Sequence, residues 1–84
     1  MGEERVDEKL ARLVVRYEGG RVDPVEFRWG AREFRVKSVN ARWVDRSTRP
    51  VRWFFSVTAE SGEVFQLSYR EGEPVWYVDR VLVT

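Results

Sequence analysis

The regular alternation of apolar and polar residues is the feature of this sequence that most constrains its fold. It has a period of two residues and recurs between turn signals. Because successive side chains of a β-strand point to opposite faces, the pattern predicts antiparallel β-strands. We predict an all-β fold, a small antiparallel meander of about six strands curled into a partly open barrel or roll. The predicted strands cover residues 10–17, 24–29, 32–44, 51–59, 63–70 and 75–83.

Matching side chains across turns predicts the register of the first hairpin. A two-residue turn at residues 30–31 places Phe27 opposite Phe34, so apolar side chains meet on one face. On the other face the same register places Arg28 opposite Glu33, so opposite charges meet. The remaining pairs of this register are Val25–Val36, Glu26–Arg35 and Trp29–Arg32.

Two further hairpins follow from the same matching, with turns at residues 60–62 and 72–73. Strand 32–44 changes phase near Lys37, and strand 75–83 changes phase after Val78, so each requires a bulge or bend. The register of strand 10–17 is not fixed by the pattern. The predicted facing pairs are Val57–Phe65, Phe55–Leu67, Trp53–Tyr69, Tyr69–Trp76 and Leu67–Val78, and the residues predicted to face the core after the first phase change are Val39, Ala41 and Trp43.

The chain of 84 residues is short enough for one domain. A chain of this length buries only about 60% of its unfolded surface, so its core requires large side chains. Four Trp, three Tyr and five Phe supply them. We predict a single β-barrel-like domain over residues 10–84, preceded by a charged N-terminal tail or short helical turn over residues 1–9.

The absence of two residue types, Cys and His, restricts the functions that the protein can have. The sequence contains neither Cys nor His, which argues against disulfides, thiolate metal sites and the commonest general base. We therefore expect no catalytic residues, no metal, no cofactor and no enzymatic activity. No apolar run approaches the roughly 20 residues of a membrane span, and the charged start lacks an apolar signal core. The expected location is the cytoplasm, without membrane contact.

Positive charge is concentrated in the middle of a nearly neutral chain. The net charge is +1, yet residues 28–52 carry eight Lys and Arg against two acidic residues, which is a net charge of +6. The predicted hairpin gives two of these cations, Arg28 and Arg35, an acidic cross-strand partner. The cations that the pattern leaves without a predicted partner are Lys37, Arg42, Arg46, Arg49 and Arg52.

One outward face combines cations with aromatic rings. The predicted register places Arg52 opposite Arg70, and like charges in this position are unfavourable without an anion nearby. Phe54 and Tyr77 lie on the same face, unless the predicted strand 10–17 or the N-terminal segment covers them. Exposed Arg and aromatic residues are typical of single-strand nucleic-acid surfaces and equally of protein interfaces. The candidate binding residues are Arg42, Arg46, Arg49, Arg52, Phe54, Arg70 and Tyr77.

Three segments carry a resemblance to a known family: VEFRWGAREFRVKSVNARWVDR, RWFFSVTAESGEVFQLSYR and VWYVDRVLV. Together they resemble a small bacterial domain of unknown function, found alone or at the C-terminal end of proteins similar to Y-family translesion DNA polymerases. The resemblance covers the chain from about Asp7 to Val83. It implies a context of DNA damage tolerance and no particular biochemical activity.

Two functions are compatible with these observations. The first is a non-enzymatic binding module, an accessory domain that acts beside single-stranded nucleic acid. The alternative is a protein–protein interaction module, including a homodimer formed through an edge strand or an aromatic patch.

Overall fold

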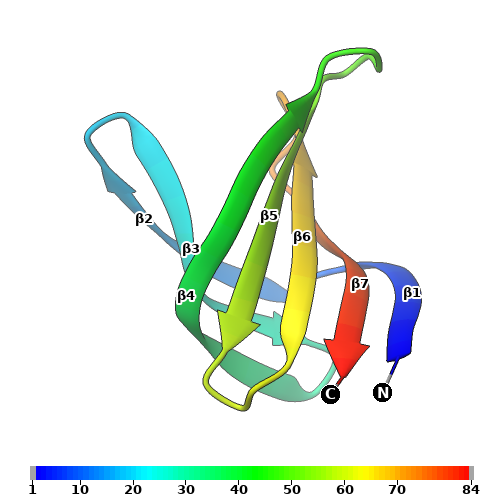
Figure 1. Ribbon diagram of the computed structural model, residues 1–84. Coiled ribbons are helices and arrows are strands. Elements are labelled where there is room, and N and C mark those ends of the chain that lie inside the picture. Colours follow the sequence, from blue (N-terminus) through cyan, green and yellow to red (C-terminus); the bar gives the residue numbers. More distant parts are fainter. Residues whose placement is uncertain (1, 84) are drawn as a thin grey trace.

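The computed structural model describes residues 2–83 and confirms the all-β prediction. Seven antiparallel strands form one sheet, and residues 2–83 contain no helix (Figure 1). It follows that no helix in this range is long and apolar enough to cross a membrane. The strands are β1 (Gly2–Lys9), β2 (Arg12–Glu18), β3 (Arg21–Trp29), β4 (Arg32–Asp45), β5 (Arg52–Ala59), β6 (Val64–Arg70) and β7 (Trp76–Val83).

The sheet curls without closing. The strand order is β1-β7-β6-β5-β4-β3-β2, so β2 to β7 form a meander, and the two edge strands, β1 and β2, are consecutive in the chain. At their junction the backbone N–H of Leu10 donates to the carbonyl of Trp76, and that of Ala11 donates to the carbonyl of Arg28, both at 2.9 Å. The junction therefore bridges β7 and β3 at one point of the roll (Figure 1).

Residues 2–9 form a strand, not the tail or helical turn that we predicted. β1 pairs antiparallel with β7, from Gly2 opposite Val83 to Lys9 opposite Tyr77. One side chain of β1, Val6, packs against the core, while most of the others are exposed. The edge of β7 thus gains a backbone hydrogen-bonding partner, which a strand edge otherwise lacks.

The hairpin registers predicted from the sequence are confirmed except for the pair Val25–Val36, which does not form because Val36 pairs with Ala59. β3 and β4 pair over four positions, and from Val36 onward β4 pairs with β5 instead. β7 also changes register next to Asp79, as its predicted phase change requires. The confirmed pairs are Glu26–Arg35, Phe27–Phe34, Arg28–Glu33, Trp29–Arg32, Trp53–Tyr69, Phe55–Leu67, Val57–Phe65, Leu67–Val78 and Tyr69–Trp76.

β4 contains two register shifts where the sequence predicted one. The first lies between Val36 and Ser38, as expected, and the second lies between Val39 and Ala41. The second shift reverses the faces again, so the predictions that Ala41 and Trp43 face the core are wrong. Trp43 instead pairs with Phe54 on the outer face and is 41% exposed.

The core fills one end of the roll. The rings of Phe27, Phe34 and Phe65 lie 4.7–5.2 Å apart between centroids, in stacked and edge-to-face contacts. These residues flank the β3–β4 and β5–β6 turns, at the lower end of the view in Figure 1. The other end, where the β2–β3 hairpin and the β4–β5 loop lie, is left open. The buried apolar residues are Phe27, Phe34, Phe55, Val57, Ala59, Phe65, Leu67, Val78 and Val81.

Candidate functional site

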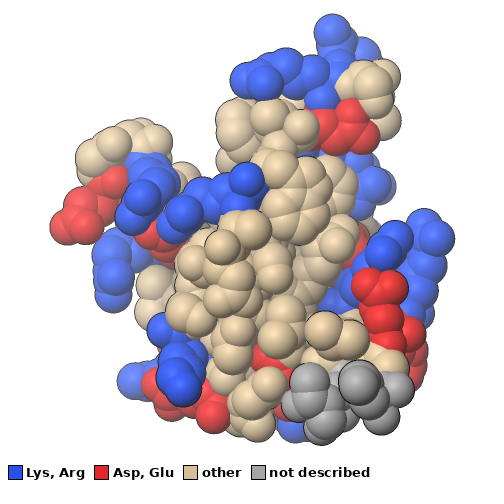
Figure 2. Space-filling view, in the orientation of Figure 1, with Lys and Arg blue, Asp and Glu red and all other residues tan. Residues whose placement is uncertain are grey.

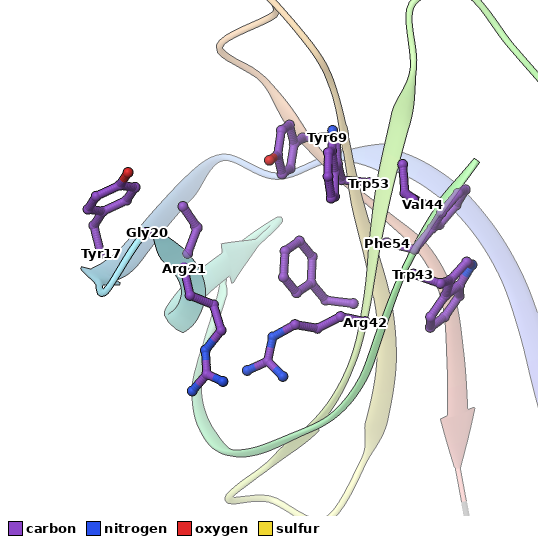
Figure 3. A pocket seen from close by; sticks show the side chains of 11 residues that line it. Tyr17, Gly20, Arg21, Arg42, Trp43, Val44, Trp53, Phe54 and Tyr69 are labelled. Atoms are coloured by element: carbon purple, nitrogen blue, oxygen red, sulfur yellow. The ribbon is translucent and has the colours of Figure 1, made fainter. Parts of the chain in front are cut away.

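A cleft of about 510 Å³ lies at the open end of the roll. The tip of the β2–β3 hairpin forms one wall, and the inner face of β4, β5 and β6 forms the other (Figure 3). Figure 2 shows Lys and Arg over the hairpin and over the β4–β5 loop, with uncharged surface between them. The residues that line the cleft are Tyr17, Gly20, Arg21, Val22, Arg42, Trp43, Val44, Trp53, Phe54, Phe55 and Tyr69.

The cleft exists because the β2–β3 hairpin leaves the sheet. β3 pairs with β4 only between Glu26 and Trp29, whereas it pairs with β2 along the whole length of β2. A register shift opposite Val14 and Val15 bends the hairpin away from β4. As a result Tyr17, near the tip, is 72% exposed although it lines the inner side.

Aromatic rings form the sheet wall of the cleft. The rings of Trp53 and Tyr69 are stacked at 6.5 Å with an angle of 12°, and Tyr69 continues to Trp76 at 4.5 Å. The indole N–H of Trp53 donates to the carboxylate of Glu71 at 2.9 Å, which fixes the ring. Desolvation, followed by the charge of Glu71, raises the pKa of the Tyr69 hydroxyl above 10.0, so this hydroxyl is neutral at pH 7. The wall thus presents flat, uncharged rings.

Two guanidinium groups lie at the floor of the cleft around one carboxylate. Arg42 bonds to Asp23 through both Nε and Nη2, and the Nε of Arg21 lies 3.4 Å from the other oxygen of Asp23. The hydrogen bond from Arg42 is the largest cause that lowers the pKa of Asp23 below 3.8. The prediction that Arg42 lacks an acidic partner is therefore wrong. The three groups still carry a net charge of +1, and Figure 3 shows both guanidinium groups on the cleft side of the strands.

The β4–β5 loop carries two more cations, and one of them, Arg46, lies over an aromatic ring of the cleft. The Cζ atom of Arg46 lies 5.9 Å from the ring centroid of Trp53, and Arg49 donates to the carbonyls of Arg46 and Thr48 at 2.8 and 3.0 Å. Neither guanidinium forms an ion pair with any of residues 2–83, as the sequence predicted. Asp45 accepts hydrogen bonds from the side chain and backbone of Ser47 instead, which lowers its pKa.

The outer face carries the other aromatic and cationic residues, which contact each other, although Arg52 Nε and Asp79 Oδ2 are buried without a hydrogen-bond partner. The guanidinium of Arg52 lies 4.9 Å from the ring centroid of Phe54, 3.4 Å from Asp79 and 3.2 Å from Ser68. Arg70 lies 4.7 Å from the ring centroid of Tyr77. The prediction that Arg52 lacks an acidic partner is therefore wrong. Arg52 and Arg70 do face each other as predicted, but their side chains turn to different partners and need no anion between them.

The seven residues predicted as one site belong to three places. The sequence did not predict the cleft because its pattern places Trp53 and Tyr69 on a buried face. Their pairing is confirmed, but both rings are only half-buried, because the bend of the β2–β3 hairpin leaves the cleft beside them. Arg42 lies in the cleft, Arg46 and Arg49 lie in the β4–β5 loop, and Arg52, Phe54, Arg70 and Tyr77 lie on the outer face of β5, β6 and β7, where Phe54 also borders the cleft.

Comparison with known proteins adds no relative to this description. No family model matches the chain, and neither the curated proteins nor the solved structures contain a significant match. The resemblance to a domain associated with Y-family polymerases therefore stays a prediction. The functional argument rests on the cleft itself.

Proposed function

We propose that this protein is a non-enzymatic binding module and that its cleft holds single-stranded nucleic acid. One observation carries the proposal: flat aromatic rings form the wall of the cleft, and guanidinium groups lie at both its floor and its rim. Proteins that bind single strands without sequence preference combine these two elements, because bases stack on rings while cations meet phosphates.

The size and chemistry of the cleft support this proposal. Its volume of about 510 Å³ falls within the range of roughly 300–1,000 Å³ that is typical of small-ligand sites. Stacking of one base on an aromatic side chain contributes about 1–3 kcal/mol. The bases of a duplex are already stacked on each other, so an unpaired base is the form that an aromatic wall can accept.

The positions of the cations suggest how a single nucleic-acid strand lies along the cleft. A base that stacks on Trp53 takes the place of the Arg46 guanidinium, which lies over that ring at 5.9 Å and is then free to move to the side. The phosphate next to that base is then within reach of the β4–β5 loop, where Arg49 has no carboxylate partner in the described chain. At the opposite end of the cleft, Arg21 and Arg42 meet the next phosphate. This model makes Trp53 the main stacking residue.

A fluorescence titration with a roughly twelve-nucleotide oligothymidine tests the proposal. We expect low-micromolar binding at about 50 mM salt, with affinity falling as salt rises. Trp53→Leu should weaken binding about tenfold, because it removes a stacking surface worth on the order of 1–3 kcal/mol. Trp43→Leu is the matched control: Trp43 also borders the cleft, from the neighbouring strand β4, but its ring turns to the outer face and stacks on Phe54 at 5.3 Å (Figure 3).

Three results would overturn the proposal. The first is no binding at low micromolar protein and about 50 mM salt, and the second is binding that does not depend on salt. The third is an equal loss of affinity in the Trp43 and Trp53 variants, since that result would remove the cleft as the site. Circular dichroism of both variants establishes that they remain folded.

The wider role follows from the resemblance alone. A single-strand module related to domains found with Y-family polymerases would act as an accessory to DNA damage tolerance in the cytoplasm of a bacterium. Equal affinity for oligouridine and oligodeoxyuridine would argue for a role not confined to DNA, because the 2′-hydroxyl is what distinguishes the two.

A further inference from the structure

β2 is an edge strand with little protection against pairing. Within residues 2–83 it pairs only with β3, so its other edge presents unpaired N–H and C=O groups. The register shift of this hairpin places the extra residue, Val25, in β3, so β2 is regular over Arg12–Glu18. β2 contains neither Pro nor Lys, and it exposes Val15 by 41% and Tyr17 by 72%. Proteins usually protect such an edge, which indicates that this one has a partner.

The sequence of β2, RLVVRYE, is complementary to itself in antiparallel pairing. When Val15 faces Val15 of a second copy, Arg12 faces Glu18, so opposite charges meet at both ends. In the same register Leu13 faces Tyr17, so apolar side chains meet on the inner face. Glu18 forms no ion pair with any of residues 2–83 and is free for this contact, while Arg12 also contacts Glu33 at 2.9 Å and Glu26 at 3.7 Å in its own chain.

The neighbouring registers are unfavourable. A shift must keep inner faces together, so it moves the pairing centre by one residue to Val14 or to Arg16. Centring on Val14 places Arg12 opposite Arg16, and centring on Arg16 places that residue opposite itself. Both place like charges face to face, which destabilises a sheet. The register centred on Val15 is therefore selected by charge.

A hollow beside β2 provides room for the partner's side chain. It has a volume of about 410 Å³ and lies between the inner side of β2 and the β6–β7 turn. Leu13, Val15, Val75 and Trp76 are among its apolar lining. In the register centred on Val15, Tyr17 of the second copy lies next to Leu13, at this hollow. Each copy would thereby cover the most exposed aromatic ring of the other.

We propose that the chain forms a two-fold symmetric dimer by antiparallel pairing of β2 with β2 of a second copy. The interface is isologous, since both copies contribute the same strand. The β2–β3 hairpin that carries it projects from the rest of the molecule, so two copies can approach without contact between their cores (Figure 1). The proposal does not depend on nucleic-acid binding.

Light scattering coupled to size exclusion tests the oligomeric state. We expect a concentration-dependent mass of twice the 10.0 kDa chain. Val15→Lys should shift the protein to the monomer, because it places two ammonium groups together at the two-fold axis. Leu82→Lys is the matched control: Leu82 is exposed to a similar extent, 39%, but lies on β7, and its variant should remain dimeric.

A cysteine placed at the axis tests the register. The chain contains no Cys, so Val15→Cys introduces the only thiol. Oxidation should link two copies through it, because only the register centred on Val15 brings the two Cβ atoms within disulfide distance. Leu82→Cys should not form the link under the same conditions. A wild-type monomer at every concentration, a dimer that persists in Val15→Lys, or equal linking of both Cys variants would each overturn the proposal.

Discussion

Asp23 is the residue that allows two arginines to share the floor of the cleft. Its carboxylate contacts Arg42 and Arg21 on different oxygens, and without it the two guanidinium groups would repel each other. The side chain of Asp23 is 20% exposed, so water screens this interaction only in part. Because its pKa is lowered in the folded state, the carboxylate links the stability of the protein to pH.

We predict that Asp23→Asn flattens the acid side of the pH–stability curve. The folded carboxyl has a pKa below 3.8, so between that lowered value and 3.8 the native state binds fewer protons than the unfolded state. Stability from Asp23 is therefore fully present above this window and is lost as the pH falls through the folded pKa. Urea denaturation of both proteins between about pH 2.5 and 6, followed by tryptophan fluorescence, measures the difference.

Glu60→Gln is the control for this prediction. Glu60 is exposed at the β5–β6 turn and forms no ion pair with any described residue. Its removal should leave the acid limb of the curve unchanged. If Asp23→Asn and Glu60→Gln have the same acid limb, the contact between Asp23 and Arg42 does not stabilise the folded state.

At the scale of strands, the sequence specifies pairing better than it specifies shape. The hairpin registers follow from matching side chains, since a one-residue slip would expose the whole apolar face. β1 was missed because a single inward residue, Val6, gives no period to detect. The second shift in β4 was missed because Ala41 is small enough for either face. The apolar–polar pattern of one strand does not show where its neighbouring strand bends.

The contact between Arg52 and Asp79 connects β5 to β7 across β6, because Asp79 occupies the bulge of β7. We predict that Arg52→Met costs about 3 kcal/mol at pH 7, since it leaves the buried carboxylate, 7% exposed, without its cation. The double variant Arg52→Met/Asp79→Asn should recover part of this loss, because it removes the buried charge as well. Urea denaturation of the three proteins measures both effects.

The pH dependence distinguishes this effect from a simple packing defect. Burial raises the pKa of Asp79 above 3.8, so the native state binds more protons than the unfolded state between these two values. An ionised Asp79 therefore lowers the free energy of unfolding most at pH values above the pKa of the folded state. This loss becomes smaller as the pH falls and the carboxyl is protonated. Arg52→Met should lose less stability relative to the wild type near pH 4 than at pH 7. An equal loss at both values would mean that the charge of Asp79 is not involved.

For the whole molecule, the open end of the roll decides where a ligand can bind. A short chain with extents of 32 × 26 × 23 Å concentrates its core at one end, and the bent hairpin leaves the other end hollow. The sequence indicated the cations of the β4–β5 loop but not the cleft. The cleft depends on the pairing of the two edge strands, β1 with β7 and β2 with β3. The chain passes from the side of β7 to the side of β3 at Leu10 and Ala11, where two backbone hydrogen bonds hold it. Backbone hydrogen bonds cannot be predicted from the pattern of side chains.

The position of the loop cations relative to the cleft leads to a last prediction. Each phosphate contact to a single strand contributes about −0.7 to the slope of log K against log salt. The double variant Arg46→Ala/Arg49→Ala should therefore weaken oligothymidine binding and reduce the magnitude of this slope by about 1.4. Arg28→Ala/Arg35→Ala removes two equally exposed guanidinium groups from the β3–β4 hairpin, at the other end of the roll, and should leave the slope unchanged. Equal changes in both double variants would show that oligothymidine binding depends on the net charge of the protein and not on the cations at the rim of the cleft.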